Sequence, residues 1–196
     1  MKKAFVIAEF DSTNLPTKYF ARPVGIDFGI RTYLTLSDGR TFQCPHFFTQ
    51  NLGHYERCNL MGYILDKQHK WHEEIARDLC NRYDAIFLET LDLDEIGRKY
   101  RKKMIDCDHE QFLGVLYKMA EEKNVIVHKV HKYYASSKTC TCGHVYRGKY
   151  SHYWTCPKCK ATHERDSLAA RNILHQGILD LKKKGYTYLF ENCEIL

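Results

Sequence analysis

The sequence predicts an α/β fold, in which helices flank a mixed sheet and a cysteine-containing segment is inserted before the last helix. Three observations lead to this prediction. Apolar, strand-like runs surround an Asp-Gly turn early in the chain. Two later segments repeat their apolar residues at intervals of three and four, with short apolar runs between them. Two close cysteine pairs then precede a final helical stretch. Strands and helices that alternate in this way form layered domains.

Composition is that of a globular protein with one domain and room for one insertion. The chain has 196 residues, of which 44% are hydrophobic, so it can bury a core. No run of eighteen apolar residues occurs, and Met1–Ala8 lacks both a long apolar stretch and a small-residue cleavage site. The nine cysteines are odd in number and four of them form two tight pairs, which suits reduced metal ligands better than a disulfide framework.

The net charge of +6 is distributed unevenly. Residues 1–97 carry 11 Lys and Arg against 14 Asp and Glu, whereas residues 98–184 carry 19 against 8. Clustered basic residues are typical of proteins that bind a phosphate backbone, and a solvated lysine-rich surface is the alternative. We therefore expect a nucleic-acid partner. Since the sequence has no long apolar run and no cleavage site, we also expect no membrane partner and an intracellular, cytoplasmic location at the nucleoid.

Three antiparallel strands are expected early in the chain. Lys3–Phe10 reads as a preceding strand that ends in a loop. Val24–Ile30 follows with Asp27 in its middle, and Thr32–Leu36 and Thr41–Phe48 flank the Asp-Gly turn. An unpaired carboxylate in a buried strand is costly, so Asp27 needs a partner unless it lies in an edge turn.

Helices and strands alternate in the rest of the chain. Leu60–Arg82 and His109–Lys123 have helical periodicity, and Ala85–Leu88 and Val125–Val130 read as buried strands. With the last helix the order is βββαβαβα, the ribonuclease H arrangement. Glu89 lies at a strand end, where it either binds a metal ion or is paired or solvated.

The stretch Thr155–Leu174 brings a cysteine pair close to a third acid. Cys156 and Cys159 have the C-x-x-C spacing of a zinc knuckle, in which two thiolates bind one ion from a tight turn. Asp166 follows at the start of a predicted helix, Ser167–Lys183.

Three segments, GIDFGIRTYLTLSDG, AIFLETLDL and TCPKCKATHERDSLAARNIL, resemble in this order the three RuvC motifs of TnpB. TnpB is the OrfB family of transposon-encoded RNA-guided nucleases and is related to the compact type V CRISPR effectors. The resemblance covers about residues 24–174, and it implies an RNase H-like (RuvC) fold with Asp27, Glu89 and Asp166 as catalytic carboxylates. Four cysteines match the family's zinc ribbon: Cys140, Cys142, Cys156 and Cys159.

The resemblance also divides the chain. Residues 1–135 with 164–185 correspond to the RuvC-like nuclease domain, 136–163 to an inserted ribbon of the target nucleic-acid-binding type, and 186–196 to a tail. Three carboxylates offer acceptor oxygens that suit Mg²⁺ or Mn²⁺. Two such ions about 4 Å apart can activate a water and stabilise the leaving 3′ oxygen of a phosphodiester. We expect Asp27 to bridge both ions, and Glu89 and Asp166 each to hold one side.

Three features depart from the family pattern. The first knuckle, Cys140-Thr141-Cys142, is one residue shorter than C-x-x-C, so we expect strain there. A four-cysteine zinc site, a mixed site in which His144 replaces a thiolate, and an empty ribbon all remain open. Leu168 stands where the family has Asn. The chain begins just before the first motif, so the N-terminal lobes that hold guide RNA in TnpB relatives are expected to be missing.

Basic and aromatic residues interleave between the cysteine pairs, as in segments that stack on nucleotides and contact phosphates. Tyr153 and Trp154 either make such contacts or pack the small ribbon. The expected nucleic-acid contacts are Arg98, Lys99, Arg101, Lys102, Lys103, Arg147, Lys149 and Arg165.

Together these features predict a Mg²⁺- or Mn²⁺-dependent DNA endonuclease of RuvC type with a structural Zn²⁺ ion. It would be a TnpB-like, transposon-associated protein that works on DNA with a guide RNA or a partner protein. One alternative is a non-catalytic nucleic-acid-binding regulator or accessory protein derived from such a nuclease, and another is a marginally folded remnant with neither activity.

Overall fold

The computed structural model describes residues 22–29, 31–45, 47, 54–90, 107–149, 151–186 and 190, with only the backbone described for 54–59. The predicted strand Lys3–Phe10 and most of the 186–196 tail lie outside the described residues. So do five predicted nucleic-acid contacts, Arg98, Lys99, Arg101, Lys102 and Lys103.

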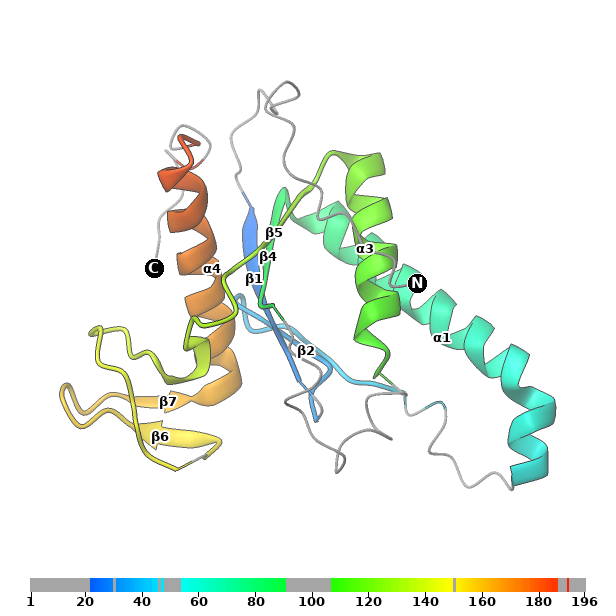
Figure 1. The fold of residues 1–196 in the computed structure, drawn as a ribbon, viewed down its shortest axis with the longest axis horizontal. Coiled ribbons are helices and arrows are strands. Elements are labelled where there is room, and N and C mark those ends of the chain that lie inside the picture. The colour runs from blue at the N-terminus through cyan, green and yellow to red at the C-terminus, as the bar shows by residue number, and fades with distance from the viewer. Residues whose placement is uncertain are drawn as a thin grey trace.

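A five-stranded mixed sheet forms the centre of the fold (Figure 1). Its strands are β1 (Pro23–Phe28), β2 (Leu34–Leu36), β3 (Thr41–Phe42), β4 (Ala85–Leu88) and β5 (Ile126–Lys129). They lie in the order β3-β2-β1-β4-β5. The first three pair antiparallel, whereas β4 runs parallel to both β1 and β5. The predicted mixed sheet with three early antiparallel strands is confirmed.

The strand predicted over Thr41–Phe48 is much shorter than expected, because β3 ends at Phe42. Pro45 has no N–H to donate to a neighbouring strand, which ends a hydrogen-bonded ladder. As an edge strand, β3 also has a partner on one side only. Residues 43–45 and 47 therefore do not extend the sheet, and His46 and Phe48 lie outside the described residues.

Helices cover both faces of the sheet (Figure 1). The helices α1 (His54–Arg82) and α3 (His109–Lys123) lie on one face, and α4 (Arg165–Lys183) lies on the other. Side chains of β4 alternate between the faces. Ile86 and Leu88 pack with α1 and α3, whereas Ala85 and Phe87 pack with α4. This central strand is buried on both sides, as expected for a parallel strand between two helical layers.

A small ribbon connects β5 to α4. It comprises a short 3-10 helix, η1 (Ser136–Lys138), and a hairpin formed by β6 (Tyr153–Thr155) and β7 (Thr162–Glu164). The hairpin lies beside the first turns of α4 (Figure 1). No helix within the described ranges combines the length and the apolar character needed to span a membrane.

The helix α4 lies directly on the sheet because two glycines leave room for it. A Cβ atom at Gly25 would lie 2.1 Å from the carbonyl oxygen of Ala170 and 2.5 Å from the nitrogen of Leu174. A Cβ atom at Gly177 would lie 2.1 Å from the ring of Phe87. This close approach fixes the position of the helix that carries Asp166.

Candidate active site and metal centre

Asp27 and Glu89 come together because β1 and β4 run parallel. Their register pairs Ile26 with Leu88, so the next residue of each strand is one of the two acids. Asp27 is 7% exposed and faces Thr35 of β2 across the antiparallel ladder. The backbone N–H of Phe28 donates to Glu89 Oε1 at 3.2 Å, which holds that carboxylate against β1.

Asp166 approaches the carboxyl ends of β1 and β4 from the first turn of α4. The side chain of Glu164 caps this helix and accepts from the backbone N–H groups of Asp166 (3.3 Å) and Ser167 (2.8 Å). Partial burial acts to raise the pKa of Glu164, but these hydrogen bonds hold it below its ordinary value. The cap thus fixes the backbone of Asp166.

The acids interact through their charges. Burial raises the pKa of Asp27 well above its ordinary value, and the neighbouring charges of Glu89 and Asp166 raise it further. Burial also raises the pKa of Glu89 to about 6, against the opposing hydrogen bond from Phe28 and the charge of Arg165. The three predicted carboxylates are therefore close enough to share one electrostatic site.

Two residues beside the acids have roles that the sequence did not suggest. Glu164 is a fourth acid whose charge also acts on Asp27, yet its side chain is occupied by capping α4. Arg165 was predicted to bind nucleic acid. Its charge lowers the pKa values of both Asp27 and Glu89, and its Nη1 lies 3.5 Å from Asp166 Oδ1. Arg165 is thus the cation that faces the acidic group.

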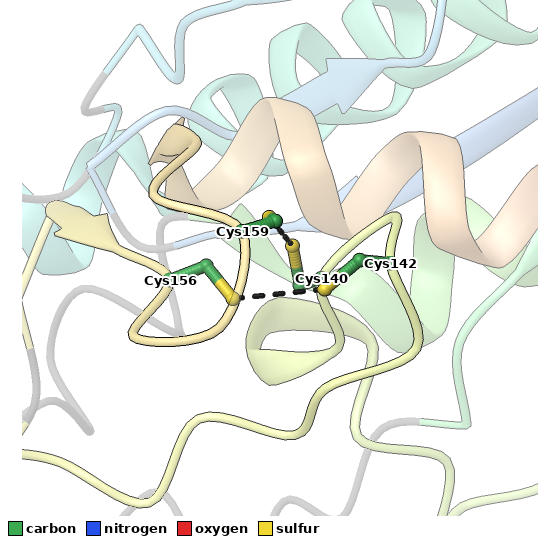
Figure 2. A group of neighbouring side chains, drawn as sticks. All are labelled: Cys140, Cys142, Cys156 and Cys159. Atoms are coloured by element: carbon green, nitrogen blue, oxygen red, sulfur yellow. Dashed lines mark hydrogen bonds between the residues drawn. The ribbon is translucent and has the colours of Figure 1, made fainter.

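The four predicted cysteines form one compact group (Figure 2). Their sulfur atoms all lie within 4.8 Å of one another, and Figure 2 shows each pair meeting the other. Cys140 Sγ is 3.5 Å from Cys159 Sγ, and Cys142 Sγ is 3.7 Å from Cys156 Sγ. In a tetrahedral site with Zn–S bonds of about 2.3 Å, neighbouring sulfurs lie about 3.8 Å apart. The cluster therefore has the donor set and spacing for a tetrahedral metal ion.

The short Cys140-Thr141-Cys142 knuckle reaches this geometry through its backbone. Gly143 has a φ of +81° and donates its N–H to the Cys140 carbonyl, which closes a tight turn. His144 accepts from the Cys140 N–H through its carbonyl group. The histidine ring that approaches the thiolates is instead that of His163, whose Nε2 lies 3.0 Å from Cys140 Sγ.

Hydrogen bonds act in opposite directions on the two thiols of the second knuckle. The Ala161 backbone acts to lower the pKa of Cys159, but the neighbouring thiols raise it to about 12, so Cys156 is the thiol prepared for metal binding. Burial acts to raise the pKa of the Cys156 thiol, but backbone N–H groups of Cys159 and Lys158 and the neighbouring thiols bring it down to about 6. A low pKa favours the thiolate, which is the form that binds a metal ion.

Leu168 joins the ribbon to the last helix. It is 4% exposed and packs with Trp154, Cys140 and Cys156 in a small cluster. Trp154 stacks on Tyr146 with ring centroids 4.7 Å apart, so it packs the ribbon. Tyr153 is exposed. The apolar residue two positions after Asp166 thus forms part of the ribbon core, where a polar Asn would have to be buried.

Asn172 makes a second connection between α4 and the ribbon. Its Nδ2 donates to the carbonyl oxygens of Ser136 at 2.7 Å and Thr139 at 2.6 Å. These carbonyl groups lie just before the first metal knuckle. Among the remaining predicted nucleic-acid contacts, Arg147 and Lys149 are exposed on the ribbon.

The carboxylates are spread more widely than the cysteines. Among the residues that the structure describes, the cysteine cluster is the group of potential ligands that gathers within 4.8 Å. A two-ion site does not require such a compact group, because ions about 4 Å apart divide their ligands between them.

Comparisons with known proteins agree with this arrangement. The family described as "Cas12f1-like, TNB domain" matches residues 109–173, a range that contains β5, the ribbon and half of α4. A protein named as a transposase from Acanthamoeba polyphaga mimivirus is 28% identical over 203 residues, covering 84% of this chain and 42% of that protein. A protein named as an RNA-guided DNA endonuclease from Streptomyces pristinaespiralis is 26% identical over 203 residues, and the match covers 89% of this chain and 50% of that protein.

Solved structures show the same fold. A Cas12f1 chain in a complex with single-guide RNA and target DNA matches with a TM-score of 0.55 and 19% identity, covering 82% of this chain and 51% of that chain. A chain of a CRISPR-Cas12f ternary complex matches with the same TM-score, and the match covers 82% of this chain and 40% of that chain. The chain spans about half the length of the relatives that it matches, or less.

The chain is thus an α/β protein with a mixed sheet, flanking helices and an inserted cysteine ribbon, and its fold is similar to that of the Cas12f1 chains. The matched family model and the relatives show that this chain is similar to Cas12f1-like proteins and to proteins named as a transposase and an RNA-guided DNA endonuclease.

Proposed function

We propose that this chain is a metal-dependent DNA endonuclease of RuvC type, in which Asp27, Glu89 and Asp166 form the catalytic site. The observation that supports it most is the convergence of these three acids, from two strands and a helix, into one electrostatically coupled group. A protein that only bound nucleic acid would gain nothing from burying one carboxylate, Asp27, beside two partly buried carboxylates that repel it. Its phosphate-binding surface would be weakened by them.

The residues fit the divalent ions that this chemistry needs. Asp27, Glu89 and Asp166 would hold Mg²⁺ or Mn²⁺, since their oxygens are acceptor ligands and their mutual repulsion is relieved by cations. When bound, such ions activate a water and stabilise the charge on the scissile phosphate. Cys140, Cys142, Cys156 and Cys159 would hold a structural Zn²⁺ ion.

Each acid has a different environment, which suggests separate roles. Asp27 is the most buried of the three acids and lies on β1 in the middle of the sheet, so we assign it the bridging position between two ions. Glu89 is oriented by the Phe28 N–H, and Asp166 by the start of α4. Arg165 lies where it can balance the acids before substrate arrives and contact a phosphate afterwards.

The ribbon supports the active site mechanically in this proposal. Residues 136–163 form the inserted ribbon, and residues 1–135 with 164–185 form the nuclease part. Leu168 and Asn172 attach the ribbon to the helix that carries Asp166. Loss of the metal would remove the support of the first turn of α4, and a catalytic carboxylate must be held to within about 0.5 Å.

DNA is the proposed substrate, with a guide RNA or a partner protein as the source of sequence specificity. One relative is named as an RNA-guided DNA endonuclease, and one matched structure is a complex with single-guide RNA and target DNA. Arg147, Lys149 and Arg165 are the described basic residues that we assign to nucleic-acid contact. Sequencing the nucleic acid that co-purifies tests the guided form, which requires a discrete RNA.

Cutting of end-labelled single-stranded DNA by zinc-loaded protein with Mg²⁺ or Mn²⁺ tests the function. Asp27→Ala and Glu89→Ala should each reduce the rate roughly a hundredfold or more, because a preorganised charge is lost from the site. The matched control is Asp66→Ala, an exposed acid on α1 that pairs with Lys70. Equal cutting by all variants would refute the site. Tight, salt-dependent binding without any cutting would favour the non-catalytic alternative.

A further inference from the structure

A short segment after β5, His131–Tyr133, carries an unusually exposed aromatic ring. Tyr133 is 77% exposed, although a lone exposed tyrosine on a surface would need no explanation. Its surroundings distinguish it from such a case. The segment is built into the backbone of the fold, it lies beside a candidate catalytic acid, and a lysine ammonium group lies against the tyrosine ring.

The backbone holds the Tyr133 ring outward. The N–H of Tyr134 donates to the His131 carbonyl at 2.9 Å, and the N–H of Ser136 donates to the Tyr134 carbonyl at 2.8 Å, so the segment forms a closed turn. The side chain of Tyr134 packs inward against the core beneath α4. With Tyr134 anchored, its neighbour Tyr133 projects into solvent without the freedom of a loose loop.

The same hydrogen bonds locate the segment relative to Glu89. The N–H of Val130 donates to the Leu88 carbonyl at 2.8 Å, and Thr90 Oγ1 donates to the Val130 carbonyl at 2.8 Å. Val130 therefore touches the residues on both sides of Glu89, and the segment begins at the following position. At its other end, Asn172 holds the carbonyl of Ser136 at the start of the ribbon. The turn thus lies between a candidate catalytic acid and the ribbon.

A lysine and an imidazole ring lie against the exposed ring. Lys132 Nζ lies 5.0 Å from the Tyr133 ring centroid, and the His131 ring lies 5.2 Å from it. His131 also lines a pocket with two lysines from the end of α4, Lys183 and Lys184, and with one acid, Asp180. A nucleotide base can stack on an aromatic face while neighbouring cations contact its phosphates.

We infer that Tyr133 and Lys132 form a stacking platform that positions a base of single-stranded nucleic acid beside the candidate active site. The positioning role rests on the proposed nuclease function, whereas the binding role does not. Base stacking on an aromatic residue tolerates any sequence, because every base has a π-face. The platform would therefore hold a strand near the acids regardless of its sequence.

Fluorescence anisotropy with a labelled single-stranded oligonucleotide tests this inference. It is measured in an Asp27→Asn background with Ca²⁺, so that the strand is not cut. Tyr133→Ala should weaken binding about tenfold, the usual effect of losing one stacked base, while Tyr133→Trp should retain it. The salt dependence should not change, because stacking releases no counterions. A 2-aminopurine base in the strand should lose its quenching only in Tyr133→Ala.

The matched control is Tyr63→Ala. Tyr63 is also exposed and has Lys67 Nζ 4.5 Å from its ring centroid, but it lies on α1. Equal affinity of the Tyr133→Ala and Tyr63→Ala variants would overturn the inference, as would a salt slope that falls by about one in Tyr133→Ala. If wild-type protein fails to cut DNA, but Tyr133→Ala binds the oligonucleotide more weakly than the protein with Tyr133 does, the proposed nuclease function fails and the platform stands.

Discussion

The most specific structural prediction concerns Gly25, where β1 touches the helix that carries Asp166. In Gly25→Ala the new Cβ would lie 2.1 Å from the Ala170 carbonyl oxygen, and real Cβ atoms essentially never approach closer than 3.0 Å. Strand and helix must therefore separate by about 0.9 Å at this point. The obstacle is backbone, so no side chain can move aside to relieve it.

We expect two consequences of Gly25→Ala. Forcing a methyl group into packed structure costs about 1–3 kcal/mol, which lowers the melting temperature by roughly 3–10 °C for a chain of this size. A displacement of about 1 Å at a catalytic group can cost about a hundredfold in rate. Cutting should therefore fall even at temperatures where the variant is fully folded.

Differential scanning calorimetry and the DNA-cutting assay measure these effects on the same preparations. The control is Gly114→Ala on α3, where a Cβ would meet nothing within 4 Å. This variant should keep its activity and gain up to about 1 kcal/mol in stability, because alanine favours a helix. An unchanged melting temperature and cutting rate in Gly25→Ala would refute the close packing of α4 on β1.

Three further predictions concern the acids and the ribbon. Because burial and its acidic neighbours raise the pKa of Asp27, metal-free protein should lose stability as the pH rises through that raised pKa. Asp27→Asn should therefore raise the melting temperature in EDTA more at pH 8 than at pH 4.5, and equal shifts would contradict this. Cys156→Ser should lose both zinc, measured by mass spectrometry, and cutting; full cutting without zinc would disprove the mechanical coupling. Asn172→Ala should cost about 1–3 kcal/mol and speed zinc loss to a chelator relative to Gln176→Ala, since two carbonyl groups lose their donor. Identical zinc-loss rates would exclude that connection.

Strongly patterned elements could be predicted from the sequence, and their ends less well. The expected strand Ala85–Leu88 and helix His109–Lys123 match β4 and α3 at both ends. The last helix starts at Arg165 instead of Ser167 because Glu164 caps it. Glutamate is not among the preferred capping residues, so nothing in the local sequence marked that boundary.

The residue types of the candidate site were predictable, but their contacts were not. The acids meet through the parallel register of β1 and β4 and the close approach of α4 at Gly25, and local periodicity encodes neither. The short cysteine knuckle was expected to be strained, yet a left-handed Gly143 closes it. The approach of His163 to Cys140 depends on the β6–β7 register, which pairs His163 with Trp154.

The central claim, that three acids form one site for divalent cations, is tested most directly by calorimetric titration of zinc-loaded, nucleic-acid-free protein with Mn²⁺. Wild-type protein and the Asp66→Asn control should bind Mn²⁺ with the same affinity and stoichiometry, and Asp27→Asn should lose that binding, because Asp27 is the buried acid on the central strand and has the charges of both other acids close to it. Indistinguishable titrations of wild type and Asp27→Asn would contradict the claim.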